Sequence, residues 1–210
     1  MAGFKVHSNV AAAISTSIAI GLFCYGKINI ENAIFYALLG TIGGLSPDID
    51  SAHSTSIKVV FFSLAIFCSV SIGLILNKSI PMSMLVINMV SVFLSIQFVL
   101  QGAFKKIAVH RGSCHSLAFA VLIGVMMVNI LYLLKIKIET CWLAGVFLTF
   151  GCLIHLVIDE FYSFDFKNKK IKSSLGTAIK VISFNSPIVS TLQAVSIVFL
   201  LYCAPHFTLF

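Results

Sequence analysis

Three short segments of the chain carry most of its side chains that could do chemistry. Residues 110–116 read HRGSCHS and crowd two imidazoles, a guanidinium and two hydroxyls between long apolar stretches. Residues 46–50 read SPDID, and residues 155–159 read HLVID. Imidazole nitrogens and carboxylate oxygens are the ligands that Zn²⁺ and Mn²⁺ accept in proteins. We therefore ask whether these segments meet at one metal site.

The segment HLVID is the strongest of the three signals. On a helix, residues four positions apart lie only about 40° from each other, so His155 and Asp159 share one face. A histidine and an aspartate on an apolar helix are costly unless they face the protein interior, where such residues are candidates for function. A purely structural hydrogen bond between them is the alternative.

The other two segments also have ordinary interpretations. Asp48 and Asp50 follow Pro47 and could form a solvated turn, because proline and aspartate are common in turns. The HRGSCHS segment could be a cationic loop that touches lipid phosphates, which Lys105 and Lys106 would favour. Histidine suits that role poorly, since it is mostly neutral at pH 7.

Composition places these segments in a membrane protein. Hydrophobic residues make up 59% of the 210 residues and charged residues 10%, far from the roughly 25% charged residues of soluble domains. Spans of about 20 residues, the length that crosses the hydrocarbon core, are predicted near 9–25, 32–46, 57–76, 81–101, 115–134, 141–162 and 185–204. We expect an all-α polytopic bundle of six to seven transmembrane helices that forms a single integral membrane domain over residues 1–210.

Two of the predicted spans, 32–46 and 9–25, allow more than one interpretation. The stretch 32–46 is short and rich in glycine, so a tilted, broken or partly re-entrant span is expected there. The first span follows Lys5, but no small-residue cleavage site follows it, so we interpret it as a retained helix rather than a signal peptide. His7 is then part of the mature protein.

Seven spans divide the connecting segments between two sides of the membrane. The side of the N-terminus carries ten basic residues and the other side four; the ten are Lys5, Lys58, Lys105, Lys106, Arg111, Lys167, Lys169, Lys170, Lys172 and Lys180. The positive-inside rule makes the ten-residue side cytoplasmic, as for a multi-pass protein of the bacterial inner membrane with a cytoplasmic N-terminus. Residues 163–184 form a basic cytoplasmic segment, suited either to the lipid interface or only to retention on that side.

The same topology gathers the polar residues at the cytoplasmic ends of the helices. Four histidines and three aspartates fall there, enough for one or two ions, with Zn²⁺ the first expectation and Mn²⁺ the second. The predicted metal ligands are His7, Asp48, Asp50, His110, His115, His155 and Asp159. Asp48 and Asp50 could also take a proton from water, and Arg111 could clamp a phosphate.

The ordered series of an N-terminal histidine, GLSPDID, HRGSCHSL, HLVID and the later SSLGTAIK resembles the YdjM-like family of LexA-regulated, membrane-bound proteins assigned as metal-dependent hydrolases. The resemblance covers nearly the whole chain. It implies that His and Asp residues bind metal and hydrolyse an ester, and it extends distantly to zinc-dependent phospholipase C, whose H-x-x-x-D pair His155 and Asp159 match. Family members commonly carry threonine where this chain has Cys114. We expect Cys114 to lie beside the metal ligands without binding the metal itself.

The functional expectation is a membrane-bound hydrolase that cleaves a phosphoester or related ester of a lipid with metal-activated water. The alternative is a transporter or channel that moves metal ions or protons through the same cluster, although transporters usually bind near the midplane between repeated halves. A third interpretation is a structural metal site without turnover. The basic charge is explained by the membrane, and we expect no nucleic-acid partner; the sequence leaves the oligomeric state open.

Overall fold

The chain folds into helices that occupy the predicted spans. The computed structural model describes residues 3–51, 54–107, 113–165, 170–171, 181 and 187–206. Within them the helices are α1 (Phe4–Cys24), α2 (Ile30–Gly43), α3 (Thr55–Leu76), α4 (Met82–Leu94), α5 (Gln101–Ile107), α6 (Leu117–Leu133), α7 (Ile138–Ser163) and α8 (Pro187–Cys203). A π-helical segment, η2 (Ser95–Leu100), joins α4 to α5 in one helical run, and a 3₁₀ turn, η1 (Pro47–Asp50), follows α2.

The prediction of a transmembrane helix bundle is confirmed. Four helical runs in the described part of the chain are long and apolar enough to cross a membrane: Phe4–Cys24, Thr55–Leu76, Met82–Lys106 and Ile138–Ser163. Three shorter apolar helices, α2, α6 and α8, complete the set. Large apolar side chains such as Phe98 and Leu133 are exposed on the outside of the protein, as expected where lipid rather than water is the solvent.

Short polar side chains set where several helices begin. The Asn29 side chain accepts a hydrogen bond from the Asn32 amide at the start of α2, and Ser54 accepts one from Ile57 at the start of α3. Ser116 accepts from the Phe119 amide at 3.1 Å and so begins α6 at Leu117. Such caps satisfy amides that the helix itself leaves unpaired. The cap at Ser116 leaves His115 just outside its helix.

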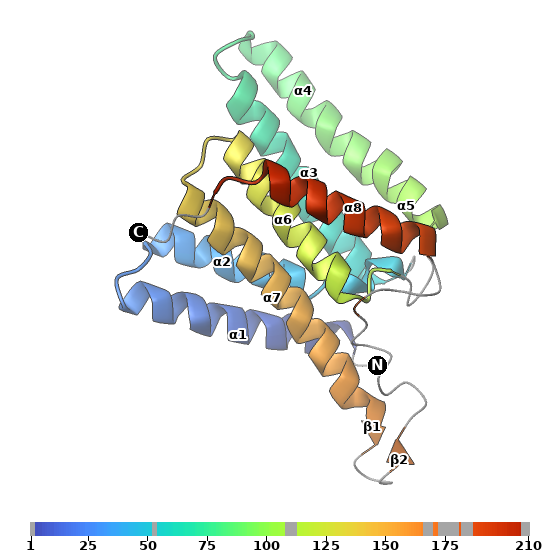
Figure 1. Ribbon diagram of the computed structural model, residues 1–210. Helices are drawn as coiled ribbons and strands as arrows, with labels where there is room; N and C mark the ends of the chain where they lie inside the picture. Colours follow the sequence, from blue (N-terminus) through green and yellow to red (C-terminus); the bar gives the residue numbers. More distant parts are fainter. Residues whose placement is uncertain are drawn as a thin grey trace.

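Helix α7 is the centre of the bundle. It packs against α1, α2 and α6, while α8 packs on α6 and α3 pairs with α4. It is the most buried of the long apolar helices. Figure 1 shows α1 and α2 on one side of α7, α6 and α8 on the other, and the α3 and α4 pair beyond them. A two-residue pairing of β1 (Phe164–Asp165) with β2 (Lys170–Ile171) follows α7 and extends beyond the bundle.

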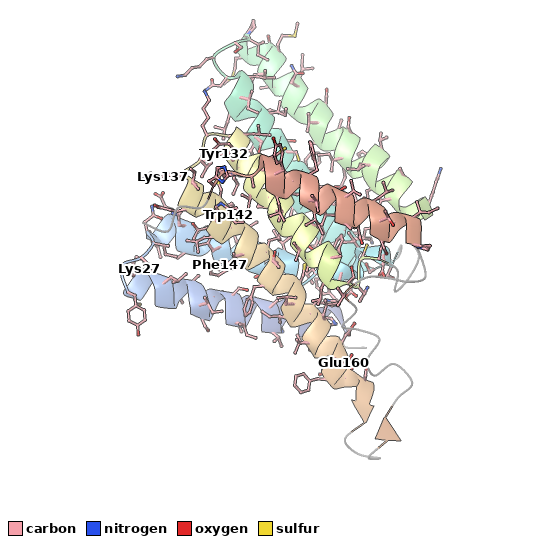
Figure 2. All side chains as sticks on the ribbon, in the orientation of Figure 1. Lys27, Tyr132, Lys137, Trp142, Phe147 and Glu160 are labelled. Carbon is pink, nitrogen blue, oxygen red and sulfur yellow. The ribbon has the colours of Figure 1, made fainter. Side chains whose placement is uncertain are left out.

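Two of the four basic residues that the topology assigned to the side away from the N-terminus lie at one end of the bundle. Lys27 and Lys137 lie near the start of α7, and Glu160 lies toward its other end (Figure 2). The start of α1, the end of α2 and the start of α6 lie toward the Glu160 end (Figure 1). The predicted basic segment 163–184 falls mostly outside the described residues, so its interfacial role stays a prediction.

The glycine-rich second span is one continuous helix in the described structure. Its 14 residues extend about 21 Å at the usual rise of an α-helix, which is less than the roughly 30 Å of a hydrocarbon core. The glycines at its C-terminal end allow close packing against α7. A Cβ atom on Gly43 would collide with the Leu148 carbonyl oxygen of α7, and one on Gly151 would collide with the Gly40 carbonyl oxygen of α2. Small residues of this kind let helix backbones approach each other in membranes.

This packing makes a testable prediction. Gly151→Ala should lower the stability of the purified protein by about 1–3 kcal/mol, because the added methyl group must push α2 away from α7. Thermal unfolding in detergent, followed by size-exclusion chromatography after heating, measures the loss. Gly21→Ala is the matched control, since a Cβ atom there meets nothing within 4 Å. Equal midpoints for the two variants would contradict the role assigned to Gly151.

Candidate metal centre

Six of the residues predicted to form the site come together at one end of the bundle. His7 comes from the first turns of α1, Asp48 and Asp50 from η1, and His115 from the residue pair that precedes α6. His155 and Asp159 come from the second half of α7. The other two predicted residues, His110 and Arg111, lie outside the described residues. Segments that are far apart in the sequence thus supply one cluster.

The cluster contains two groups of donor atoms that could hold a metal ion. His7, Asp48 and His155 form one group, and His115, His155 and Asp159 form the other, with the donor atoms of each group within 4.8 Å of one another. His155 is common to both groups. Because one ring nitrogen binds only one ion, the two groups are parts of a single shared centre rather than two separate sites.

Four donor atoms at the middle of this centre are linked by four short nitrogen–oxygen distances. The His155 Nε2 atom lies 3.5 Å from Asp48 Oδ1 and 3.7 Å from Asp159 Oδ2. The His115 Nε2 atom lies 3.8 Å from each of the same two oxygens. Ligands of a tetrahedral zinc ion with bonds of about 2.0–2.1 Å are separated by about 3.3 Å. These four distances are slightly longer than those between the ligands of such an ion, and Asp48 and Asp159 fall in different groups of donor atoms.

Hydrogen bonds at Nδ1 orient both of these histidines. His155 donates from Nδ1 to the Gly44 carbonyl oxygen at 2.7 Å, and Nδ1 of His115 lies 3.0 Å from Asp50 Oδ2. A neutral imidazole that donates from Nδ1 presents the lone pair of Nε2. Both rings thus present Nε2 to the same two carboxylate oxygens.

His7 completes the cluster from the side of α1. Its ring stacks on that of His155, with centroids 3.7 Å apart and planes inclined by 14°. Its Nε2 atom lies 3.3 Å from Asp159 Oδ1, whereas Asp159 Oδ2 faces His115 and His155. The Asp159 carboxylate therefore faces His7 with one oxygen and faces His115 and His155 with the other.

The chemistry of the buried atoms fits a bound cation. Both ring nitrogens of His7, Nε2 of His115, Nε2 of His155 and Oδ1 of Asp159 are buried without a hydrogen-bond partner among the residues that the structure describes. Buried polar atoms are normally paired, and buried carboxylates need a compensating positive charge. A metal ion among these atoms would meet both needs.

Asp48 is the most exposed of these acidic residues. Its side chain is 16% exposed, whereas those of Asp50 and Asp159 are 2% and 3% exposed. Its Oδ2 atom accepts a 3.4 Å hydrogen bond from the Ser56 hydroxyl, and its main-chain oxygen accepts one from Ser54. Among the acidic residues of the described centre, Asp48 is thus the one whose side chain is partly exposed.

Cys114 and Gly44 also lie near the centre. Cys114 belongs to neither group of donor atoms. Burial, and then the nearby Asp50 carboxylate, raise the pKa of its thiol to about 12, so the thiol is protonated at neutral pH. Gly44, which orients His155, was not predicted from the sequence, because no side-chain type marks a main-chain carbonyl as a hydrogen-bond acceptor.

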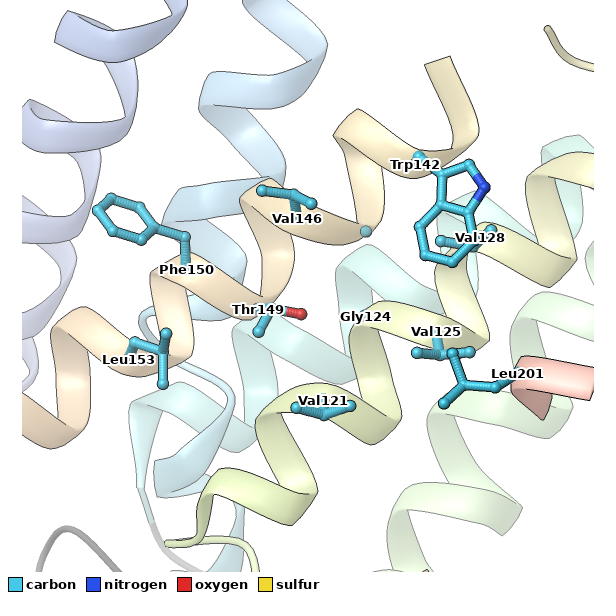
Figure 3. Close-up of a pocket in the computed structure, with 11 residues that line it drawn as sticks. Val121, Gly124, Val125, Val128, Trp142, Val146, Thr149, Phe150, Leu153 and Leu201 are labelled. Atoms are coloured by element: carbon cyan, nitrogen blue, oxygen red, sulfur yellow. The ribbon is translucent and has the colours of Figure 1, made fainter. Parts of the chain in front are cut away.

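An apolar groove of about 340 Å³ lies on a different part of α7. Figure 3 shows it between α6 and α7, close to α8; its walls include Val121, Val125, Val146, Phe150, Leu153 and Leu201. Leu153 and His155 are two positions apart and so point about 160° away from each other around the helix. The groove is therefore separated from the metal centre by the body of α7.

Comparison with known proteins gives one result. A family model described as "YdjM inner membrane protein" matches residues 11–201. No curated protein and no solved structure matches the chain. The matched region contains Asp48, Asp50, His115, His155 and Asp159, and His7 precedes it.

The geometry predicts that a divalent metal stabilises the protein through Asp159. Saturating Zn²⁺ should raise the thermal midpoint of the chelator-treated protein. At a thousand times the Kd, binding adds about 4 kcal/mol to the free energy of unfolding. Asp159→Asn keeps the shape of the side chain but removes its charge, so this variant should lose the shift. His206→Ala removes an exposed histidine of the described chain and is the control. A full zinc shift in Asp159→Asn would refute the assignment.

Proposed function

This chain belongs to the YdjM inner membrane protein family, and we propose that it is a metal-dependent hydrolase whose substrate is a lipid or another membrane-associated ester. The observation that carries the proposal is the meeting of the four donor atoms of His115, His155, Asp48 and Asp159. The family description and the apolar helices indicate an inner membrane location and a lipid environment. The hydrolytic activity is our inference.

The proposed metal is Zn²⁺, with Mn²⁺ as the second choice, because imidazole nitrogens and carboxylate oxygens suit both ions. A divalent ion at this centre would supply a water of lowered pKa and would polarise a carbonyl or phosphoryl oxygen. His115 and His155 would provide the neutral ligands and Asp159 a carboxylate ligand, a set of three that leaves a position for water. Asp48 would lie beside the ion and help to balance its charge. His7 supports Asp159 from the opposite oxygen.

Asp48 is the residue best placed to take part in the reaction itself. Its Oδ1 atom faces the nitrogens of His115 and His155, and its Oδ2 atom is held by Ser56. It is also partly exposed, so a substrate that enters the centre passes this carboxylate. We assign Asp48 the acceptance of a proton at a carboxylate oxygen while its other oxygen stays toward the two histidines.

The position of the centre favours a substrate held in the membrane interface. The centre lies at the ends of α1, α2 and α6 rather than in the middle of the bundle (Figure 1). An ester in the headgroup region of a lipid would reach such a depth, and Arg111 is proposed to bind its phosphate. A transporter would more commonly hold its ion near the midplane, so we favour hydrolysis over transport.

The proposed orientation places the centre on the cytoplasmic side. The basic residues of the sequence concentrate on the side of the N-terminus, and the positive-inside rule then places this side in the cytoplasm. Lys27 and Lys137, two of the four basic residues assigned to the opposite side, lie at the end of the bundle away from the centre (Figure 2). A cytoplasmic centre would act on lipids of the inner leaflet.

The experiment is a hydrolysis screen with the purified, zinc-loaded protein. Phospholipids and lipid phosphates in mixed micelles are the substrates, and released phosphate, phosphorylated headgroup and fatty acid are measured. We expect zinc-dependent release from at least one class, and a loss of at least about 100-fold in Asp48→Ala, the order expected for a general base. Membrane vesicles with the cytoplasmic face outward should cleave an added impermeant ester, and vesicles of the opposite orientation should not.

One control variant and two possible outcomes separate the alternatives. Glu139→Gln removes an exposed carboxylate at the start of α7 and should retain full activity. Zinc flux into liposomes without hydrolysis of any substrate would contradict the proposal and favour transport. A tightly bound ion with neither hydrolysis nor flux would favour a structural metal site.

A further inference from the structure

We infer that Asp50 is a positioning residue that directs His115 toward the metal, an assignment that rests on the metal centre of the proposed function. Sequence reasoning counted Asp50 among the ligands together with Asp48. The structure places the two carboxylates on different sides of the His115 ring. Asp50 Oδ2 is 3.0 Å from Nδ1, whereas Asp48 Oδ1 is 3.8 Å from Nε2.

The geometry of the ring separates the two roles. The lone pair of Nε2 and the proton of Nδ1 point in divergent directions in the plane of an imidazole. An ion bound at Nε2 is therefore out of reach of a carboxylate oxygen that accepts the Nδ1 proton. In agreement, both groups of donor atoms that could hold an ion exclude Asp50.

The burial of the pair makes the contact specific. Both side chains are almost fully buried, at 4% exposure for His115 and 2% for Asp50. The two residues are 65 positions apart in the sequence, so the contact fixes the start of α6 against η1. A carboxylate on Nδ1 holds the ring in one tautomer and increases the basicity of Nε2, an arrangement that recurs in metal sites.

The same short segment orients the other histidine. The Gly44 carbonyl oxygen accepts from Nδ1 of His155, and Gly44 precedes η1 by only three residues. Residues 44–50 therefore contain an acceptor for each histidine and, between them, the proposed proton acceptor Asp48. We assign to this segment the orientation of both imidazole ligands, with Asp50 as its side-chain contribution.

The test compares Asp50→Asn, Asp50→Ala and His115→Ala. An asparagine oxygen can still accept the Nδ1 proton, so Asp50→Asn should bind one ion with affinity only modestly reduced. Asp50→Ala should bind the same number of ions with an affinity about 10–100-fold lower, the loss expected for an outer hydrogen-bond partner. Competition with a chromophoric chelator measures the affinity, and elemental analysis measures the number of ions.

The electronic spectrum of the Co²⁺-loaded protein distinguishes positioning from ligation. Both Asp50 variants should keep the positions of the wild-type visible bands, because the set of coordinating atoms is unchanged. His115→Ala should shift them, because a nitrogen ligand is lost. Glu139→Gln is the matched carboxylate control and should behave as the wild type. If Asp50→Ala does not fold, the bands of Asp50→Asn still decide the question.

Three results would overturn the inference. A Co²⁺ spectrum of Asp50→Asn whose bands differ from those of both the wild type and His115→Ala would make Asp50 a ligand. Wild-type affinity in both Asp50 variants would show that the contact does not serve metal binding. A wild-type protein that binds neither Zn²⁺ nor Co²⁺ would remove the metal centre itself, and so refute the proposed function together with this inference. The first two results leave the proposed function intact.

Discussion

The close contact between the backbones of α2 and α7 is the constraint on which the rest of the centre depends. Glycines let the two helices approach until a single added Cβ atom at Gly43 or Gly151 would collide with the opposite backbone. At this separation the Gly44 carbonyl oxygen reaches the His155 ring. One turn earlier in α7, the Cys152 thiol donates a hydrogen bond to the Gly43 carbonyl oxygen. Packing of small residues, rather than a special loop, thus sets the orientation of a histidine at the centre.

A second constraint follows from the burial of charge. In a bundle surrounded by lipid, carboxylates and imidazoles are stable only when they face one another or bind an ion. Here the three aspartates and three histidines of the described centre face one another, yet several of their atoms still lack hydrogen-bond partners within the described structure. The cluster is therefore better explained as a set of ligands than as a self-sufficient network. The metal proposal starts from the unpaired atoms of His7, His115, His155 and Asp159, and the positioning role of Asp50 starts from its contact with His115.

Much of the fold was predictable because a membrane restricts what a chain can do. Apolar stretches of about 20 residues must become helices, and the predicted spans agree with the observed helices to within a few residues at most ends. The start of α1 at Phe4 rather than near residue 9, and the end of α5 at Ile107 rather than near residue 101, are the clearest differences. His7 is buried against α7, so the helix continues through a polar stretch that hydropathy alone excludes.

The candidate centre was only partly predictable. The spacing of His155 and Asp159 and the charge-based topology were sufficient to expect convergence. They gave no way to tell Asp48 from Asp50, because two carboxylates two residues apart in a 3₁₀ turn differ only in which neighbour each one meets. The orienting role of Gly44 was also out of reach, since it depends on the tertiary approach of α2 to α7.

The central claim is that one ion is held by the imidazoles of His115 and His155 and the carboxylate of Asp159. X-ray absorption at the zinc edge of the zinc-loaded protein in detergent tests it most directly. The account predicts a first shell of nitrogen and oxygen at about 2.0–2.1 Å, with the outer-shell scattering of two imidazole rings. One ring should disappear in His115→Ala. A first shell that contains sulfur at about 2.3 Å, or one without imidazole scattering, would contradict the account.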